Sequence, residues 1–277
     1  MARAAVTAAL VFELAFALFG AMPAQPQTSL RAQSTQSALS QVWPASTNPR
    51  LSWLVVDLAT GQIIAQQGID PDRPIAVGSL AKPFLALAYA RTHSGYPHFT
   101  CRGAQDRCWL PHGHGSLDLQ QALAHSCNAY FLSLAGQIDP AALQSVVQLL
   151  DLPAPPSGAS PATLIGLDPG WQIAPATLAR AYARLLTQPG TADIFAGLRE
   201  AAFTGTASAL HGEDALAKTG TAPCHHRGCI ASADGLVVAL TPAAAPRTLL
   251  LVRQQGSTGA ATAPIAARML RLLEAPR

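Results

Sequence analysis

The segment Val77-Gly78-Ser79-Leu80-Ala81-Lys82 places a lysine three residues after a serine. Residues at positions i and i+3 lie on one face of a helix, so a helix that starts near Ser79 predicts the Lys82 amine beside the Ser79 hydroxyl. A serine hydroxyl is a weak nucleophile until a base takes its proton, and an amine whose pKa is lowered by burial is such a base. The segment therefore predicts nucleophilic chemistry. Taken alone, S-x-x-K also describes an ordinary capped helix.

Two further motifs follow along the chain. In Ser126-Cys127-Asn128 a hydroxyl and an amide lie two residues apart, where the first can relay a proton and the second can hold a substrate carbonyl. A serine and an asparagine near a helix end are also common caps. In Lys218-Thr219-Gly220-Thr221, a strand would put Lys218 and Gly220 on one face, and the glycine would allow close approach of a substrate or another backbone. The alternative is a strand that ends in a turn.

Lysine usage singles out the same positions. Of the 18 Lys and Arg residues, only Lys82 and Lys218 are lysine. Lysine can lose its proton in a buried site, whereas arginine effectively cannot. A coding bias toward arginine is the alternative explanation. Both lysines fall inside the motifs, and the ordered set S-x-x-K, S-x-N and K-T-G is far more specific than any one of its parts.

Composition narrows the class of protein. The 277 residues are 49% hydrophobic and 12% charged, which is typical of a single globular domain with a sizeable core. The formal net charge is only +3 and there is no long basic run. Because nucleic-acid binders usually carry a dense basic face, we expect no nucleic-acid partner.

The order of predicted elements indicates a mixed α/β (α+β) fold. Apolar and β-branched runs predict strands at 51–57 and 62–66 and again at 235–240 and 248–253. Helical patterns lie between them at 79–91, after the candidate cap Asp118, and at 140–150 and 175–186, and a last helix is predicted at 260–273. The first and last strands would form one antiparallel sheet, with a helical block inserted between them.

Residues 1–24 have the features of a secretion signal. Arg3 precedes an almost wholly apolar run over 4–21, and small residues follow. The run also approaches the length of a membrane span, so an uncleaved anchor is one alternative and a buried N-terminal helix is another. Residues 25–50 are rich in Gln, Ser, Thr and Pro and predict a flexible linker. We therefore expect an exported protein, periplasmic or at the cell surface, either released or anchored in the cytoplasmic membrane through residues 4–21.

The motifs together resemble the transpeptidase domain of penicillin-binding proteins, especially the class B kind, within the serine D,D-peptidase and β-lactamase superfamily. The resemblance extends beyond the motifs over 51–277. It includes the segments 77–84, 108–109, 112–115, 119–131, 165–166, 173–175, 179–182 and 263–266. It implies a central antiparallel sheet flanked by helices, with an inserted all-helical lobe.

The resemblance also implies an activity and a role for each residue. Family members are acylated by D-Ala-D-Ala peptidoglycan stem peptides and by β-lactams, as D,D-transpeptidases or D,D-carboxypeptidases. Carried over by position, Ser79 attacks the substrate carbonyl and Lys82 takes the proton of Ser79. Ser126 passes a proton to the leaving amine, and Lys218 tunes the electrostatic field of the site. The substrate-binding residues would be Asn128, Thr219, Gly220 and Thr221. The backbone N–H groups of Ser79 and Thr221 would form an oxyanion hole. The resemblance implies no cofactor or metal, and it implies cell-wall proteins as partners.

Some features depart from the family pattern. Larger members carry a pedestal or a glycosyltransferase domain, for which these residues leave no room, and Asp234-Gly235-Leu236 stands where an aromatic pair is common. A serine β-lactamase is an alternative, but class A enzymes use a Glu between the second and third motifs, and the only ones there, Glu200 and Glu213, lie close to the third motif. Class D enzymes would have an apolar residue in place of Asn128. A β-lactam sensor or a scaffold for cell-wall machinery is the non-enzymatic alternative.

Five cysteines in an exported chain suggest disulfides. The local pairs Cys101–Cys108 and Cys224–Cys229 are the ones that we expect, which leaves Cys127 unpaired. The run Cys224-His225-His226, with Cys229 close by, offers a metal site as an alternative to the second disulfide.

Overall fold

The computed structural model describes residues 27–224, 229 and 233–274. The expected signal or anchor at 1–24 lies outside these residues, as do His225 and His226 of the alternative metal site. Within the described ranges, no helix combines the length and the apolar character needed to cross a membrane.

A five-stranded antiparallel sheet forms the centre of the molecule, with strand order β2-β1-β9-β8-β7. Its strands are β1 (Leu51–Asp57), β2 (Gln62–Gln67), β7 (Leu216–Pro223), β8 (Ala233–Thr241) and β9 (Thr248–Gln255). The first hairpin pairs with the last strand of the chain through β1 and β9. This confirms the predicted sheet, in which the two ends of the domain meet.

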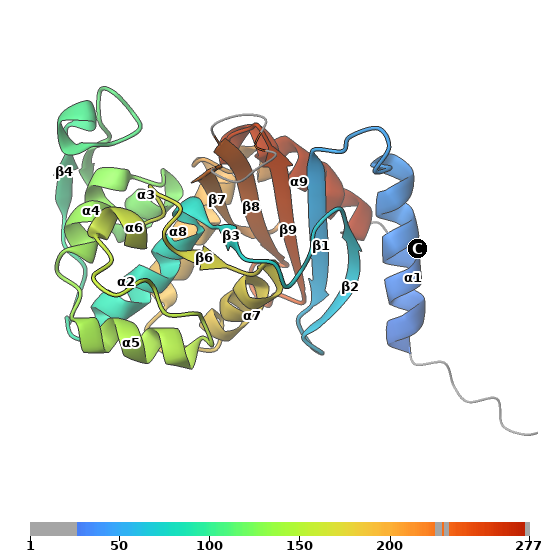
Figure 1. The fold of residues 1–277 in the computed structure, drawn as a ribbon, viewed down its shortest axis with the longest axis horizontal. Coiled ribbons are helices and arrows are strands. Elements are labelled where there is room, and N and C mark those ends of the chain that lie inside the picture. The colour runs from blue at the N-terminus through green and yellow to red at the C-terminus, as the bar shows by residue number, and fades with distance from the viewer. Residues whose placement is uncertain (1–26, 225–228, 230–232, 275–277) are drawn as a thin grey trace, which may run out of the picture.

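Both faces of the sheet are buried, because alternate residues of each strand point to opposite sides. On β1, Leu54 and Val56 belong to the core shared with the inserted helices, whereas Trp53 and Val55 belong to a second core. The second core lies under α1 (Gln27–Val42) and α9 (Gly259–Glu274), which contact each other. The molecule is therefore a three-layer structure, with the sheet between two sets of helices (Figure 1).

The helical lobe is inserted in the chain between β2 and β7 and gathers on one side of the sheet (Figure 1). Its helices are α2 (Lys82–Ala90), α3 (Leu119–Ala124), α4 (Asn128–Ala135), α5 (Pro140–Leu149), α6 (Pro161–Leu164), α7 (Pro175–Leu185) and α8 (Ala192–Phe203). Three 3₁₀ turns accompany them: η1 (Gly78–Ala81), η2 (Gly103–Asp106) and η3 (Ser208–Leu210). Two small sheets pair β3 (Ile75–Ala76) with β6 (Gln172–Ile173) and β4 (Phe99–Cys101) with β5 (Gly115–Leu117). This arrangement confirms the predicted fold class.

Most predicted helices begin where a local signal places them. Asp118 caps α3 through a capping box with Gln121, as expected from its position. The helix predicted from Ser79 differs at its start, because Ser79 lies in the 3₁₀ turn η1 and α2 begins at Lys82, with Pro83 in its first turn. Proline fits there because the first N–H groups of a helix have no partner within it.

The prediction of a flexible linker over 25–50 is wrong where the structure describes α1. Leu39 and Trp43 are buried against the sheet. Arg31 forms an ion pair with Asp57 of β1 and donates a 2.9 Å hydrogen bond to Thr248 Oγ1 of β9. The composition concealed this helix because few of its residues are apolar, so that packing against the sheet rather than intrinsic propensity stabilises it.

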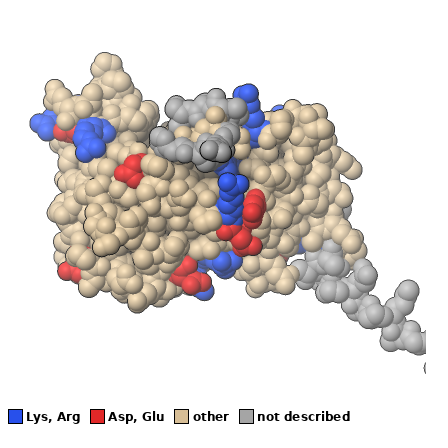
Figure 2. Space-filling view, viewed as in Figure 1, with Lys and Arg blue, Asp and Glu red and all other residues tan. Residues whose placement is uncertain are grey.

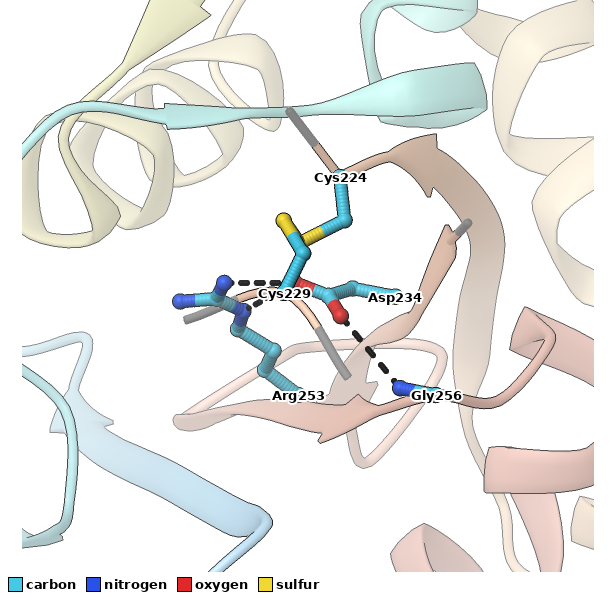
Figure 3. Close-up of a disulfide and its surroundings, with 5 residues drawn as sticks. All are labelled: Cys224, Cys229, Asp234, Arg253 and Gly256. Carbon is cyan, nitrogen blue, oxygen red and sulfur yellow. Dashed lines mark hydrogen bonds and ion pairs between the residues drawn. A yellow bond between two sulfur atoms is a disulfide. The ribbon is translucent and has the colours of Figure 1, made fainter. Parts of the chain in front are cut away.

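A disulfide and an ion pair secure the end of the sheet near β7 and β8. Cys224 and Cys229 are joined by a disulfide (Figure 3), and this is one of the two expected pairs. Buried Asp234 accepts hydrogen bonds from Arg253 Nε at 2.9 Å and from the Gly256 N–H at 3.4 Å. The position at which an aromatic pair is common in the family therefore holds an ionic link between β8 and β9.

Charged side chains are sparse on the face of the molecule that Figure 2 shows. Figure 2 shows Lys, Arg, Asp and Glu scattered over a mostly neutral face, with acidic and basic groups close together at several places. Such a surface creates only weak long-range steering of charged ligands.

Candidate functional site

A pocket of about 310 Å³ brings residues of all three motifs together. Ser79 from η1, Ser126 and Asn128 from the junction of α3 and α4, and Thr219 and Thr221 from β7 line its wall. These segments are far apart in the sequence. The structure therefore places five of the predicted site residues around one cavity beside β7, which is an edge strand of the central sheet.

The turn that carries Ser79 lies directly against β7. Gly78 has a φ of 52°, and a Cβ built on it would lie 2.8 Å from the Thr221 carbonyl oxygen. On β7, the absence of a side chain at Gly220 lets the Val77 carbonyl approach, since a Cβ there would be 3.0 Å from that oxygen. The glycines of the first and third motifs are therefore needed to hold Ser79 beside Thr221.

Ser126 has a left-handed backbone, with a φ of 52°. This conformation costs a non-glycine residue about 1–2 kcal/mol, and such strain is often found at functional sites. It turns the chain sharply between α3 and α4, so that the Ser126 carbonyl accepts a 2.9 Å hydrogen bond from Lys82 Nζ. The left-handed turn thus places both polar atoms of Ser126 beside a lysine.

Lys82 is completely buried, and its amine is held by the second motif. It donates to the Ser126 carbonyl at 2.9 Å and to Asn128 Oδ1 at 2.7 Å, and Ser126 Oγ lies 3.4 Å away. Burial lowers the pKa of Lys82 to about 7. A neutral amine has two N–H groups, so the two short bonds use both of them and leave its lone pair available for a proton.

The predicted contact between the Lys82 amine and the Ser79 hydroxyl is not a hydrogen bond in this state. Among the described residues, the amine's hydrogen bonds go to Ser126 and Asn128. Lys82 and Ser79 are instead linked through the backbone, where the Lys82 N–H donates to the Ser79 carbonyl. Catalytic hydrogen bonds are often long without substrate and tighten in the substrate complex.

Lys218 approaches Ser126 from the other side. Its buried amine donates to Ser126 Oγ at 2.8 Å and to the Thr219 carbonyl at 2.9 Å. Burial, together with the nearby charge of Lys82, holds the pKa of Lys218 well below its usual range. The Ser126 hydroxyl therefore lies between two lysine nitrogens, a geometry in which it can accept a proton from one and pass its own proton on.

The two threonines of the third motif have different surroundings. Thr219 is buried, and its Oγ1 lies 2.6 Å from Thr206 Oγ1. Thr221 is exposed, and its Oγ1 accepts a 3.1 Å hydrogen bond from the Gly259 N–H at the start of α9. Both hydroxyls are thus oriented by neighbours, in positions that line the pocket.

Sequence reasoning missed several pocket residues. Besides Thr206, the pocket is lined by Trp109, Leu167, Thr258 and Ala260. The half-exposed Trp109 donates its indole N–H to the His125 and Ser126 carbonyls, both at 3.3 Å. Trp109 lies in the segment 108–109 that resembles the family, but the sequence assigned it no role, and the other residues belong to no motif, because it is the folding of the chain that brings them to the pocket.

The expected Cys101–Cys108 disulfide is wrong. Both residues are free thiols, and Cys108 Sγ lies 3.8 Å from the thiol of Cys127. The pairing of β4 with β5 sets Cys101 opposite Gly115, and His114 immediately precedes that glycine. His114 Nδ1 therefore lies 3.6 Å from Cys101 Sγ and 3.5 Å from Cys108 Sγ. Spacing along the chain suggested a local pair, but the hairpin instead gathers the thiols around His114 and Cys127.

Solved structures with the same fold come from several bacterial penicillin-binding proteins. Penicillin-binding protein 2 of Pseudomonas aeruginosa, in complex with WCK 5153, has 18% identity and a TM-score of 0.71, over 90% of this chain and 75% of that one. Penicillin-binding protein A of Mycobacterium tuberculosis, as a ceftriaxone acyl-enzyme complex, has 16% identity and a TM-score of 0.67, over 88% and 78%. Penicillin-binding protein 2 of Helicobacter pylori, in complex with MreC, has 15% identity and a TM-score of 0.65, over 86% and 62%. At these identities the likeness shows the fold.

Sequence comparison shows the family. Among curated protein sequences there is no match to this chain. The family model described as "Penicillin binding protein transpeptidase domain" matches residues 51–198, a range that contains the first two motifs and more than half of the chain. Together with the fold, this match establishes that the chain belongs to the penicillin-binding protein transpeptidase family.

Proposed function

We propose that the chain is a serine D,D-transpeptidase or D,D-carboxypeptidase that reacts through an acyl-enzyme on Ser79. The observation that carries the proposal is the convergence of Lys82 and Lys218 on the Ser126 hydroxyl, in a pocket that Ser79 lines. The substrates are peptidoglycan stem peptides that end in D-Ala-D-Ala, and β-lactams acylate the same serine. The ceftriaxone acyl-enzyme of the Mycobacterium tuberculosis protein of the same fold supports this chemistry.

Acylation begins with proton transfer from Ser79 Oγ to the neutral amine of Lys82. The oxygen attacks the carbonyl carbon of the penultimate D-Ala, and the new C–O bond gives a tetrahedral intermediate. The N–H groups of Ser79 and Thr221 stabilise its oxyanion, because such donors act where the charge develops. The C–N bond then breaks as Ser126 passes its proton to the departing D-Ala nitrogen and takes the proton that Lys82 received from Ser79. Lys218, which donates a hydrogen bond to Ser126 Oγ, maintains the electrostatic field around that oxygen.

Deacylation transfers the acyl group to a second acceptor. An amine from a neighbouring stem peptide gives a cross-link, whereas water gives a shortened peptide, and either reaction restores the Ser79 hydroxyl.

Substrate binding before acylation uses the second and third motifs. Asn128 positions the substrate amide, Gly220 lets the substrate backbone approach β7, and Thr219 and Thr221 bind the terminal carboxylate of the substrate. The exposed Thr221 and the Thr206–Thr219 pair of hydroxyls support this placement of the carboxylate.

This chemistry takes place on the outer side of the cytoplasmic membrane, where peptidoglycan is built. The Cys224–Cys229 disulfide supports an oxidising compartment. Cell-wall assembly proteins are the protein partners that we propose, as in the Helicobacter pylori complex with MreC. An N-terminal signal or membrane anchor in residues 1–24 would deliver the domain to that compartment.

Mass spectrometry of the intact protein after penicillin treatment tests the proposal. We expect one adduct per chain, located on the peptide that contains Ser79, with loss of the adduct in Ser79→Ala. Ser116→Ala removes an exposed serine away from the pocket and is the matched control. The absence of any adduct on the folded protein would refute the proposal.

The lifetime of the adduct separates the alternatives. A stable adduct with D-Ala release from a stem peptide supports the proposed enzyme, whereas a stable adduct without D-Ala release indicates a sensor or scaffold. Rapid turnover indicates a serine β-lactamase. The structure offers no support for a β-lactamase, since neither glutamate between the second and third motifs lines the pocket: Glu200 accepts a hydrogen bond from Thr204 at the end of α8, and Glu213 forms an ion pair with Arg271.

A further inference from the structure

Three buried thiols and one imidazole form a cluster that the proposed reaction does not use. Cys101, Cys108 and Cys127 are buried, and His114 is half-buried beside them. The four candidate ligand atoms all lie within 4.8 Å of one another. Three thiolates and one imidazole are a common ligand set for structural zinc in proteins.

Three of the six distances between the ligand atoms are those of a tetrahedral metal site. With Zn–S near 2.3 Å and Zn–N near 2.0–2.1 Å, the edges of a tetrahedron are about 3.8 Å between two sulfurs and about 3.5 Å between a sulfur and a nitrogen. The Cys108 and Cys127 sulfurs are 3.8 Å apart. His114 Nδ1 is 3.5 Å from Cys108 Sγ and 3.6 Å from Cys101 Sγ. The three distances therefore match those expected around a single ion.

The alternative to a metal is oxidation of two of these thiols to a disulfide. The same chain forms a disulfide between Cys224 and Cys229, which requires an oxidising environment. In such an environment, two thiols as close as those of Cys108 and Cys127 would be expected to pair unless another bond to sulfur held them. Coordination to zinc supplies that bond, because a metal-bound thiolate is not free to form a disulfide.

We propose that Cys101, Cys108, His114 and Cys127 bind one Zn²⁺ ion through three Sγ atoms and Nδ1. The thiols release up to three protons on binding, and the resulting centre carries one net negative charge. The site is closed by four protein ligands, so it is structural rather than catalytic. It replaces both the expectation of no metal and the alternative at Cys224 and Cys229, whose sulfurs are joined to each other.

The location of Cys127 gives the ion a role in the proposed reaction. This cysteine lies between Ser126 and Asn128, and its sulfur caps α4 by accepting a hydrogen bond from the Tyr130 N–H at 3.5 Å. The other three ligands come from the β4–β5 hairpin and its loop. The ion would thus tie that hairpin to the strained turn of the second motif. This positioning role rests on the proposed function, whereas binding of the ion does not.

Metal content and a cobalt spectrum test the site directly. The full chain, purified without chelator, is expected to contain one zinc per chain by inductively coupled plasma mass spectrometry. Metal-free protein titrated with Co²⁺ is expected to show thiolate-to-cobalt absorption in the near ultraviolet and strong visible bands of a tetrahedral ion. His114→Gln should weaken zinc binding by at least about tenfold. His112→Gln changes an exposed histidine of the same loop and should bind as the wild type does.

Several outcomes would overturn the site. One is wild-type protein with all three thiols reduced, as counted with a thiol reagent, that binds neither zinc nor cobalt. Another is a Cys108–Cys127 disulfide found by mass spectrometry. A third is unchanged affinity in both His114→Gln and Cys101→Ser. Because loss of a ligand can also impair folding, the cobalt spectrum of the wild type decides independently of the variants.

Acylation by penicillin tests the positioning role separately. Removal of zinc from the full chain should slow adduct formation on Ser79 by at least about tenfold, and added zinc should restore the rate. A metal-free protein that is acylated at the full rate would contradict the positioning role but leave the site intact. If neither form is acylated, the proposed function fails, and the metal content and cobalt spectrum alone decide whether the site exists.

Discussion

Single residues at the pocket are held in arrangements that are unfavourable for folding. Ser126 has a left-handed backbone, and the amines of Lys82 and Lys218 are removed from water where they contact its carbonyl and hydroxyl. Each arrangement has a cost, since burial disfavours the charged form of an amine and a serine rarely adopts this backbone conformation. Their combination fixes one hydroxyl between two nitrogens, which is what relay of a proton requires.

The first prediction concerns pH. Burial lowers the pKa of Lys82 to about 7, and the amine can take a proton only when it is neutral. The rate of acylation should therefore rise with pH through about 7 and level off above it, falling about tenfold per unit on the acid side. Stopped-flow acylation between pH 5.5 and 8.5 measures this profile. A rate that does not change over that range would contradict the role of Lys82.

The second prediction concerns the same side chain. Lys82→Arg keeps a positive charge but cannot accept a proton at neutral pH, so labelling by a fluorescent penicillin should fall at least about 100-fold. Arg91→Lys, at the exposed end of the same helix, is the matched control and should label normally. Because Lys82 is fully buried, Lys82→Met provides a smaller neutral replacement that should also lose labelling. Circular dichroism checks the fold, and normal labelling of either folded variant would exclude Lys82 as the base.

The third prediction concerns Thr206. Its hydroxyl lies 2.6 Å from that of Thr219, so Thr206→Val removes a partner while leaving a similar shape. Loss of a hydrogen bond between uncharged groups costs about 0.5–1.5 kcal/mol. We therefore expect acylation efficiency to fall by roughly 2- to 13-fold, and titration of the rate against penicillin concentration measures it. Thr204→Val on the same connection, outside the pocket lining, should leave the rate unchanged.

At the scale of elements, helix α1 shows what the sequence could and could not predict. The strands β1 and β2 and the capped helix α3 were predictable, because alternation, turn residues and Asp118 are local signals. The three motifs could be read directly in the sequence. Helix α1 could not be predicted, since its formation depends on packing against an apolar face of the sheet that the linker-like composition does not reveal. The thiol cluster and the role of Thr206 could not be predicted for a related reason, because contacts between residues far apart in the sequence leave no pattern along the chain.

The fourth prediction concerns α1. Leu39 is fully buried in the core that α1 shares with the sheet, whereas Leu30 on the same helix is 57% exposed. Leu39→Ala should reduce the free energy of unfolding by about 2–5 kcal/mol, and Leu30→Ala should change it little. Urea unfolding measures both. Acylation of the folded protein should stay normal in each, because the pocket lies away from α1; equal stability of the two variants would contradict the packing.

At the scale of the whole molecule, the sheet belongs to two cores at once. Val237 and Val252 face α1 and α9, while their neighbours Leu236 and Leu251 face the helical lobe. Because both cores are built on the same strands, disruption of the sheet would disrupt both cores. The third motif lies on the edge strand of this shared sheet, so the pocket depends on both cores.

The fifth prediction follows from that shared sheet. Heating should produce one cooperative transition in which far- and near-ultraviolet circular dichroism and the capacity for penicillin labelling are lost at the same midpoint. Leu39→Ala should lower all three midpoints together. Two separated transitions, with labelling retained after the first, would show that the layers unfold independently.

The position of Trp109 has a practical consequence. Trp43, Trp53 and Trp171 are buried, but Trp109 is 53% exposed and lines the pocket. Indole emission responds to changes in solvent contact, so a molecule that enters the pocket would alter the signal of this one side chain above a constant background from the other three. The protein therefore carries an intrinsic optical reporter of occupancy, which allows binding and departure of unlabelled compounds to be followed in real time.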